Sequence, residues 1–230
     1  MRNSRTPASP PEIHAVIFDL DGLLVDTEPI LRRVDAEAVA RYGRVLTDDL
    51  RQRALGLTHE AKDRLFVKEL GLAVAPELLS AQRAERLVEL LPTVELMPGA
   101  AALVAALAAR GIPLAIASSS TAAVLRLKLQ RYPDIFLAMS AIATADHPRV
   151  VHPKPAPDVF LAAAFDLGVD PASCLAFEDS PAGIESALAA GMTVIAVPDR
   201  ELPTHPILAR AHQVLPSLLA FDPAPWSIAL

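Results

Sequence analysis

The sequence predicts an α/β fold, in which a doubly wound parallel sheet carries an inserted helical domain. Three observations predict it. Short apolar runs rich in β-branched residues are typical of buried strands, and five occur, at 14–19, 113–118, 139–144, 174–178 and 193–197. Helical patterns separate the last four runs, and strands that alternate with helices form a parallel sheet covered on both faces. One long stretch, 29–96, interrupts this alternation with helical patterns alone.

Residues that begin and end helices support the helical assignments. Ser180 can cap a helix that has Pro181 at its first position, and Gly191 can end it. Pro98 and Gly111 bracket a second helical pattern in the same way. Both stretches are therefore predicted to be helices.

The interruption divides the chain into domains. Residues 29–96 are too many for an ordinary connection between a strand and a helix, and their patterns contain no convincing strand. We expect them to fold as an all-helical second domain. Residues 13–28 and 97–230 are predicted to form a Rossmann-like α/β core, preceded by a disordered tail at 1–12.

Composition limits the classes of partner. The chain has 230 residues, 52% of them hydrophobic, and a formal net charge of −6 without a long basic run. This balance argues against nucleic acid and against an anionic membrane surface, and no stretch reaches the ~18 apolar residues of a membrane span. The single cysteine, Cys174, fits a reducing compartment. We expect a cytoplasmic monomer or weak dimer, with an organelle as the alternative location.

Acidic side chains at the end of the first predicted strand are the strongest functional signal. In AVIFDLDGLLVDTEP, residues 15–29, an apolar run ends at Asp19, and Asp21 follows after one residue. Carboxylates so close repel one another, so a cation or a reaction that needs both must hold them there. Other polar positions fall at the same predicted edge, where open parallel sheets place their binding crevice. They are Ser118 with Ser119, Lys154, and Glu178 with Asp179.

These side chains suit phosphoryl transfer. Asp19 can attack phosphorus and form an acyl phosphate, which divides one hard displacement into two easier ones. Asp21 can protonate the leaving oxygen and then activate water. Lys154 can hold the phosphate oxygens together with the hydroxyls of Ser118 and Ser119.

A divalent cation would neutralise the acids at this edge. Mg²⁺ prefers a few carboxylates, with water and substrate oxygens completing its shell. Asp19 and Asp179 are the expected side-chain ligands, and Glu178 is expected to support them without ligating.

Each position alone also has an ordinary structural explanation. An Asp-x-Asp-Gly stretch is often a turn or a cap, Ser118 can simply end a strand, and Lys154 can be a solvated surface lysine. Glu178 and Asp179 can cap the helix that follows them. Their conjunction, in order and at strand ends, favours a functional site.

The same residues resemble the haloacid dehalogenase superfamily, whose phosphatases show D-x-D, then Ser or Thr, then Lys, then an acidic pair. The matching positions are Asp19-Leu20-Asp21, Ser118, Lys154 and Glu178-Asp179. The resemblance covers essentially residues 13–200 and includes the helical stretch, which resembles the superfamily's cap domain of subfamily I. It implies a magnesium-dependent mechanism through an aspartyl phosphate, with the main-chain carbonyl of Asp21 also binding the metal.

Further stretches, among them KPAPDVF and FEDSPAGIESALAAGM, are most similar to the branch of pseudouridine-5′-phosphatases, sugar phosphatases and β-phosphoglucomutases. Asp21 argues against dehalogenation, which needs no proton donor two residues after the nucleophile. One departure is Pro153, where the superfamily commonly has glycine before the motif lysine.

The resemblance implies a phosphatase that acts on a small phosphorylated metabolite, with pseudouridine 5′-phosphate or a sugar phosphate as the expected substrate. A sugar phosphomutase is the second hypothesis, because it uses the same groups. A catalytically idle binding protein is the third. Related caps present a substrate loop where this chain has LGLTHEAK, so His59 and Lys62 are candidate cap contacts, with solvated positions near a helix start as the alternative.

Overall fold

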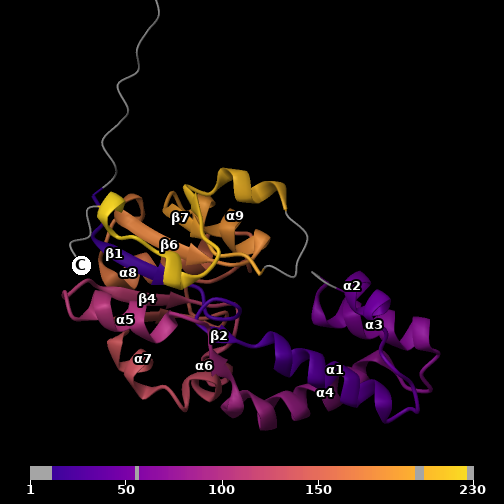
Figure 1. The fold of residues 1–230 in the computed structure, drawn as a ribbon. Coiled ribbons are helices and arrows are strands. Elements are labelled where there is room, and N and C mark those ends of the chain that lie inside the picture. The colour runs from indigo at the N-terminus through magenta and orange to yellow at the C-terminus, as the bar shows by residue number, and fades with distance from the viewer. Residues whose placement is uncertain (1–11, 55–56, 200–204, 227–230) are drawn as a thin grey trace, which may run out of the picture. The chain divides into compact units, whose positions relative to one another are not determined.

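The computed structural model describes residues 12–54, 57–199 and 205–226, so the predicted tail at 1–12 lies almost wholly outside the described residues. The chain divides into two compact units (Figure 1). One unit is Thr27–Val94, and the other contains the described residues up to Asp26 and from Glu95 onward. The boundaries predicted for the helical domain, 29 and 96, each differ from the observed ones by two residues.

The larger unit is built on a six-stranded sheet in the order β5-β4-β1-β6-β7-β8, in which all neighbours run parallel. The strands are β1 (Ala15–Phe18), β4 (Leu114–Ala117), β5 (Ala141–Ala143), β6 (Cys174–Glu178), β7 (Thr193–Ala196) and β8 (Gln213–Val214). The first strand therefore lies near the middle of the sheet, between β4 and β6. This arrangement confirms the predicted Rossmann-like α/β class.

Side chains alternate between the two faces along a strand, and the central strands β4, β1, β6 and β7 are buried on both faces. One face packs under the helices α8 (Asp158–Leu167) and α9 (Pro181–Ala189) through small residues such as Ala163 and Ala187. On the other face, Phe18 stacks on Phe177, and Phe221 meets Phe177 edge-on. The middle residues of these central strands are apolar, so the strand ends are the place for polar chemistry.

Three more helices belong to this unit, namely α5 (Ala100–Ala108), α6 (Ala122–Leu129) and α7 (Pro133–Ala138). Thr121 caps α6 by accepting from the N–H of Val124, and Pro133 begins α7. Short 3₁₀ turns of this unit lie at Pro171–Ser173, Pro206–Arg210, Leu218–Ala220 and Ala224–Trp226, and a further one, Leu91–Thr93, belongs to the smaller unit.

Three short strands were not predicted. The strands β2 (Val25–Asp26) and β3 (Glu95–Leu96) form an antiparallel pair at the two ends of the helical unit, and β8 adds an edge to the main sheet. Each has two residues, which is too short to produce a recognisable apolar alternation. The expectation that 29–96 contains no strand is wrong at its last two residues.

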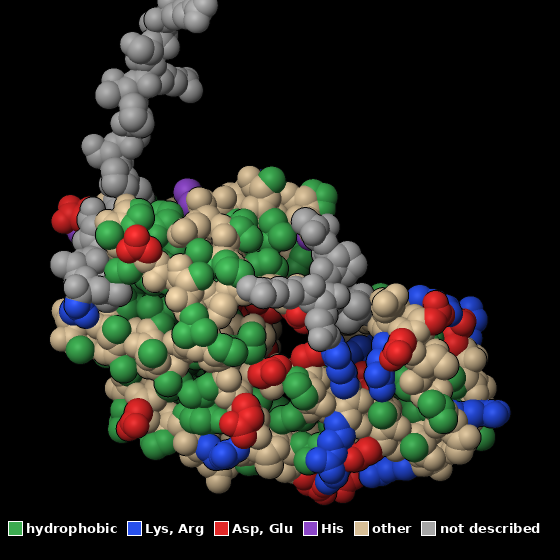
Figure 2. All heavy atoms as spheres, viewed as in Figure 1, with side chains coloured by type: hydrophobic (Ala, Val, Ile, Leu, Met, Phe, Trp, Pro, Cys, Tyr) green, Lys and Arg blue, Asp and Glu red, His purple; other side chains and the backbone are tan. Residues whose placement is uncertain are grey.

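The smaller unit contains α1 (Glu28–Ala40), α2 (Asp48–Ala54), α3 (His59–Leu70) and α4 (Pro76–Leu90). Its apolar side chains, including Val39, Phe66 and Leu79, form a separate core. Figure 2 shows Lys and Arg interspersed with Asp and Glu on the visible face of these helices. One ion pair on α1 joins Arg32 to Glu28 at 2.9 Å. Within the described residues, every helix is too short or too polar to span a bilayer.

Candidate active site

The end of β1 lies at the centre of the candidate site. Asp19 directly follows β1, and its N–H donates to the carbonyl of Phe177 on β6 at 3.0 Å. Because β4, β1 and β6 are parallel neighbours, their carboxyl ends meet at one edge of the sheet. Ser118 follows β4 and Glu178 ends β6, so the topology alone brings these residues to the same edge as Asp19.

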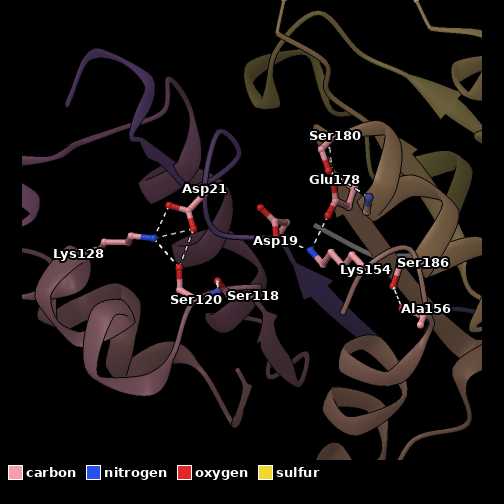
Figure 3. A network of polar contacts seen from close by, with 11 residues as sticks. Asp19, Asp21, Ser118, Ser120, Lys128, Lys154, Ala156, Glu178, Ser180 and Ser186 are labelled. Atoms are coloured by element: carbon pink, nitrogen blue, oxygen red, sulfur yellow. Dashed lines mark hydrogen bonds and ion pairs between the residues drawn. The ribbon is translucent and has the colours of Figure 1, made fainter. Parts of the chain in front are cut away.

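Lys154 joins two of the acids. Its Nζ lies 2.5 Å from Oδ1 of Asp19 and 2.6 Å from Oε1 of Glu178, and its side chain is 7% exposed (Figure 3). Burial alone would lower the pKa of Lys154, but the carboxylates of Asp19 and Glu178 outweigh burial and raise that pKa above its usual value. Lys154 is therefore a fixed cation. Pro153, which stands where the superfamily commonly has glycine, does not prevent Lys154 from contacting the two acids.

The acids carry more negative charge than this one ammonium balances. Oxygen atoms of Asp19, Glu178 and Asp179 lie within 4.8 Å of one another. Burial raises the pKa of Asp19 to about 7, with the charges of Glu178 and Asp21 adding to the rise and Lys154 opposing it. Burial, with Glu178 and Asp19, also raises the pKa of Asp179 well above its usual value. Desolvated carboxylates that repel one another form a suitable donor set for a hard divalent cation.

Glu178 differs from its neighbours because both of its oxygens already have partners. Oε1 accepts from Lys154, and Oε2 accepts from the N–H of Ser180 at 2.9 Å and from the hydroxyl of Ser180 at 3.1 Å. Ser180 in turn caps α9 by accepting from the N–H of Gly183. Glu178 thus ties Lys154 to the start of a helix, which leaves Asp19 and Asp179 as the freer carboxylates.

Two glycines permit this close packing. A Cβ on Gly22, whose φ is +83°, would lie 2.3 Å from Oδ2 of Asp179. A Cβ on Gly183 would lie 1.6 Å from Oε1 of Glu178. Both contacts are far closer than carbon and oxygen atoms can approach, so the carboxylates occupy space that only glycine leaves free.

We expect Gly183→Ala to displace Glu178 and to lower the free energy of unfolding by about 1–3 kcal/mol, the usual effect of overpacking. Turnover should fall as well, because Lys154 loses a partner. Urea denaturation and steady-state kinetics measure both effects. Ala182→Ser, at the exposed neighbouring position, is the control and should change neither. An alanine variant as stable as the parent would show that Glu178 has room to move.

Asp21 belongs to a separate network, which the sequence did not predict. Its carboxylate lies 2.6 Å from Nζ of Lys128 on α6 and accepts from the hydroxyl of Ser120 at 3.1 Å. Figure 3 shows Asp21 pointing toward Lys128, and Asp19 pointing toward Lys154. A lysine in the apolar stripe of a predicted helix, between Leu125 and Leu129, was the available signal.

The two predicted serines have different environments. Ser118 is buried and accepts from the N–H of Ser120 at 3.1 Å, and a hydroxyl that accepts this bond still has one hydrogen to donate. Ser119 is exposed. Its assignment to phosphate binding stays a prediction.

The predicted cap contacts lie on α3. Lys62 forms an ion pair with Asp35 at 3.3 Å, and Asp35 also accepts from the buried Arg83, which reaches Asp63 as well. Lys62 is thus part of an ion network inside the helical unit. His59 is the first residue of α3, and its side chain is outside what the structure describes.

Comparisons with known proteins identify the class. The model of the haloacid dehalogenase-like hydrolases matches residues 13–191, and the chain belongs to this family. A protein of Arabidopsis thaliana named (DL)-glycerol-3-phosphatase 1, mitochondrial, is 41% identical over 97% of this chain and 76% of its own length. A protein of Drosophila melanogaster named probable pseudouridine-5′-phosphatase is 35% identical over 92% of this chain and 93% of its own.

A solved structure gives the same result. A candidate β-phosphoglucomutase from Thermotoga maritima has a TM-score of 0.78 and 26% identity, covering 88% of this chain and 94% of its own. The resemblance to the superfamily is therefore confirmed, and so is the expected enzyme class, a phosphoric monoester hydrolase, since the relatives are named as phosphatases.

Proposed function

We propose that the chain is a magnesium-dependent phosphatase that hydrolyses a small phosphomonoester through a phosphorylated Asp19. One observation supports the proposal most strongly. At the carboxyl-end edge of the sheet, the ammonium of Lys154 lies together with the carboxyl groups of Asp19, Glu178 and Asp179. A single cation next to several desolvated acids suits the transfer of a charged phosphoryl group.

The chain's own residues carry out two displacements. A carboxylate oxygen of Asp19 attacks phosphorus, the bond from phosphorus to the leaving oxygen breaks, and Asp21 gives that oxygen a proton. Water then attacks phosphorus and gives a proton to Asp21, and inorganic phosphate leaves with Asp19 restored. Lys154 and the Ser118 hydroxyl bind the phosphoryl oxygens through both displacements.

Asp19 and Asp179 would hold Mg²⁺, together with the main-chain carbonyl of Asp21. The ion supplies positive charge opposite the negative charge that develops on the transferring phosphoryl group. The raised pKa values of both aspartates support this assignment, because the buried acids lack enough positive charge without it.

A small polyol phosphate is our first candidate substrate, with glycerol 3-phosphate as its representative. The relative named as a glycerol-3-phosphatase has the higher identity of the two, 41% against 35% for the one named as a pseudouridine-5′-phosphatase. Pseudouridine 5′-phosphate and sugar phosphates come next. We also propose a monomer or weak dimer in the cytoplasm, although the name of one relative makes an organelle a second candidate.

A panel of these phosphates tests the proposal, with phosphate release measured in Mg²⁺ and again in excess EDTA. We expect release from at least one alkyl phosphate and a loss of more than about 10²-fold in EDTA, because the acids would lose their counter-charge. Release that continues unchanged in EDTA would contradict the metal assignment. No release from any member would contradict the phosphatase assignment.

A sugar phosphomutase is the second candidate, supported by the structural neighbour described as a candidate β-phosphoglucomutase. A mutase returns the phosphoryl group to its sugar instead of giving it to water. Incubation with a hexose 1-phosphate separates the two activities, since a mutase forms the isomeric sugar phosphate and a phosphatase forms free phosphate.

A further inference from the structure

We propose that Lys128 and Ser120 are positioning residues that hold the carboxylate of Asp21 in place for proton transfer. The inference rests on the proposed function, which makes Asp21 the acid and base. Ser120 lies in the loop after β4, and Lys128 lies on the helix α6 that follows this loop. One segment of the core therefore supplies both partners of Asp21.

Every hydrogen of the Lys128 ammonium group has an acceptor. Its ammonium group has three hydrogens, and three acceptors surround it: Oδ1 of Asp21 at 2.6 Å, Oδ2 of Asp21 at 2.7 Å and Oγ of Ser120 at 2.6 Å. Ser120 in turn donates to Oδ2 of Asp21 at 3.1 Å. The carboxylate is thus held at both oxygens, which restricts its rotation.

Each of the two aspartates has its own lysine. Figure 3 shows the Asp19 contacts with Lys154 and the Asp21 contacts with Lys128 as separate groups. Lys128 can therefore orient Asp21 without taking the cation away from Asp19. This separation suits a site in which one carboxylate attacks phosphorus and the other moves a proton.

Folding stability does not explain a lysine at this position. Lys128 is 6% exposed and lies among the buried leucines of α6, where the methylene groups of methionine can take the place of the lysine stem. The side chain of Asp21 is 33% exposed, so water can solvate its carboxylate when the ammonium is absent. We therefore expect Lys128→Met to fold normally and to lose activity.

The experiment compares two substrates in Mg²⁺: p-nitrophenyl phosphate, whose leaving group needs no proton, and the alkyl phosphate that the parent hydrolyses fastest. For Lys128→Met, kcat/KM with the alkyl phosphate should fall by about 10²-fold or more, the usual contribution of general acid catalysis. With the aryl phosphate it should fall by less than about 3-fold, because kcat/KM covers only the steps through release of the leaving group.

Five further variants make the test specific. Lys128→Arg keeps a cation and should recover part of the loss, and Ser120→Ala should show a smaller loss with the same substrate preference. The double variant Asp21→Asn/Lys128→Met should be no slower than Asp21→Asn alone, since both changes remove one function. Arg126→Met removes an exposed cation from the same helix and should match the parent.

Two results would overturn the inference: Lys128→Met as active as the parent with both substrates, or an equal loss with both. Failure of the proposed function gives a different result, because Asp19→Asn would then keep turning over both substrates. Thermal unfolding of every variant shows that the comparison is made on folded protein.

Discussion

Asp19→Asn is expected to reduce turnover by at least roughly 10³-fold while the protein stays folded. An amide is a poor nucleophile toward phosphorus, so the first displacement fails. Stability in metal-free buffer should be equal to or higher than that of the parent. The change removes one of three neighbouring carboxyl groups that repel one another, and Lys154 keeps its contact with Glu178.

Phosphate release and thermal unfolding measure these two effects. Asp170→Asn is a matched control, because Asp170 is an exposed acid that caps a 3₁₀ turn and asparagine caps equally well. Near-parent turnover in the Asp19 variant would contradict the assignment of the nucleophile.

Lys154→Met is expected to have a large effect on stability as well as on turnover. It leaves the buried carboxylates of Asp19 and Glu178 without their shared cation, and breaking such a buried pair typically costs about 3–5 kcal/mol. The loss should be greater at pH 8 than at pH 6. Burial already raises the pKa of Asp19 to about 7, so in the folded variant Asp19 binds a proton at pH 6 and loses its charge. In the unfolded chain Asp19 is ionised at both pH values. At pH 8 the folded variant must therefore either keep an unpaired buried charge or take up a proton, and both cost stability.

Urea denaturation at the two pH values measures this effect, with Arg126→Met, which removes an exposed cation on α6, as the control. A methionine variant with the stability of the parent at pH 8 would show that the acids do not depend on Lys154. If Mg²⁺ restores part of the lost stability of Lys154→Met, this would support the metal assignment, because the ion would then replace part of the missing positive charge.

The sequence predicted the part of the site that follows from strand order. Asp19 and Lys154 are 135 positions apart, yet both were expected at one edge, because the carboxyl ends of parallel strands meet there. Helix bounds could also be predicted where residues typical of helix ends were present, as at Ser180 before α9 and Gly191 just after it.

The contact between Asp21 and Lys128 was not predictable in this way. It joins residues 107 positions apart and depends on how α6 turns its buried face toward the loop after β1, which periodicity does not specify. The network of Asp35, Asp63 and Arg83 was not predictable for the same reason, because it forms only when α1, α3 and α4 pack together.

Direct detection of a phosphorylated side chain is the decisive measurement. Protein quenched in acid within milliseconds of mixing with substrate and Mg²⁺ is reduced with borohydride, which converts an aspartyl phosphate to homoserine, and the peptides are mapped by mass spectrometry. We expect homoserine at position 19. With p-nitrophenyl phosphate, whose leaving group needs no proton, its yield should rise when Asp21→Asn slows the second displacement. Homoserine at another aspartate, or its absence from both proteins while phosphate is released, would contradict Asp19 as the phosphorylated nucleophile.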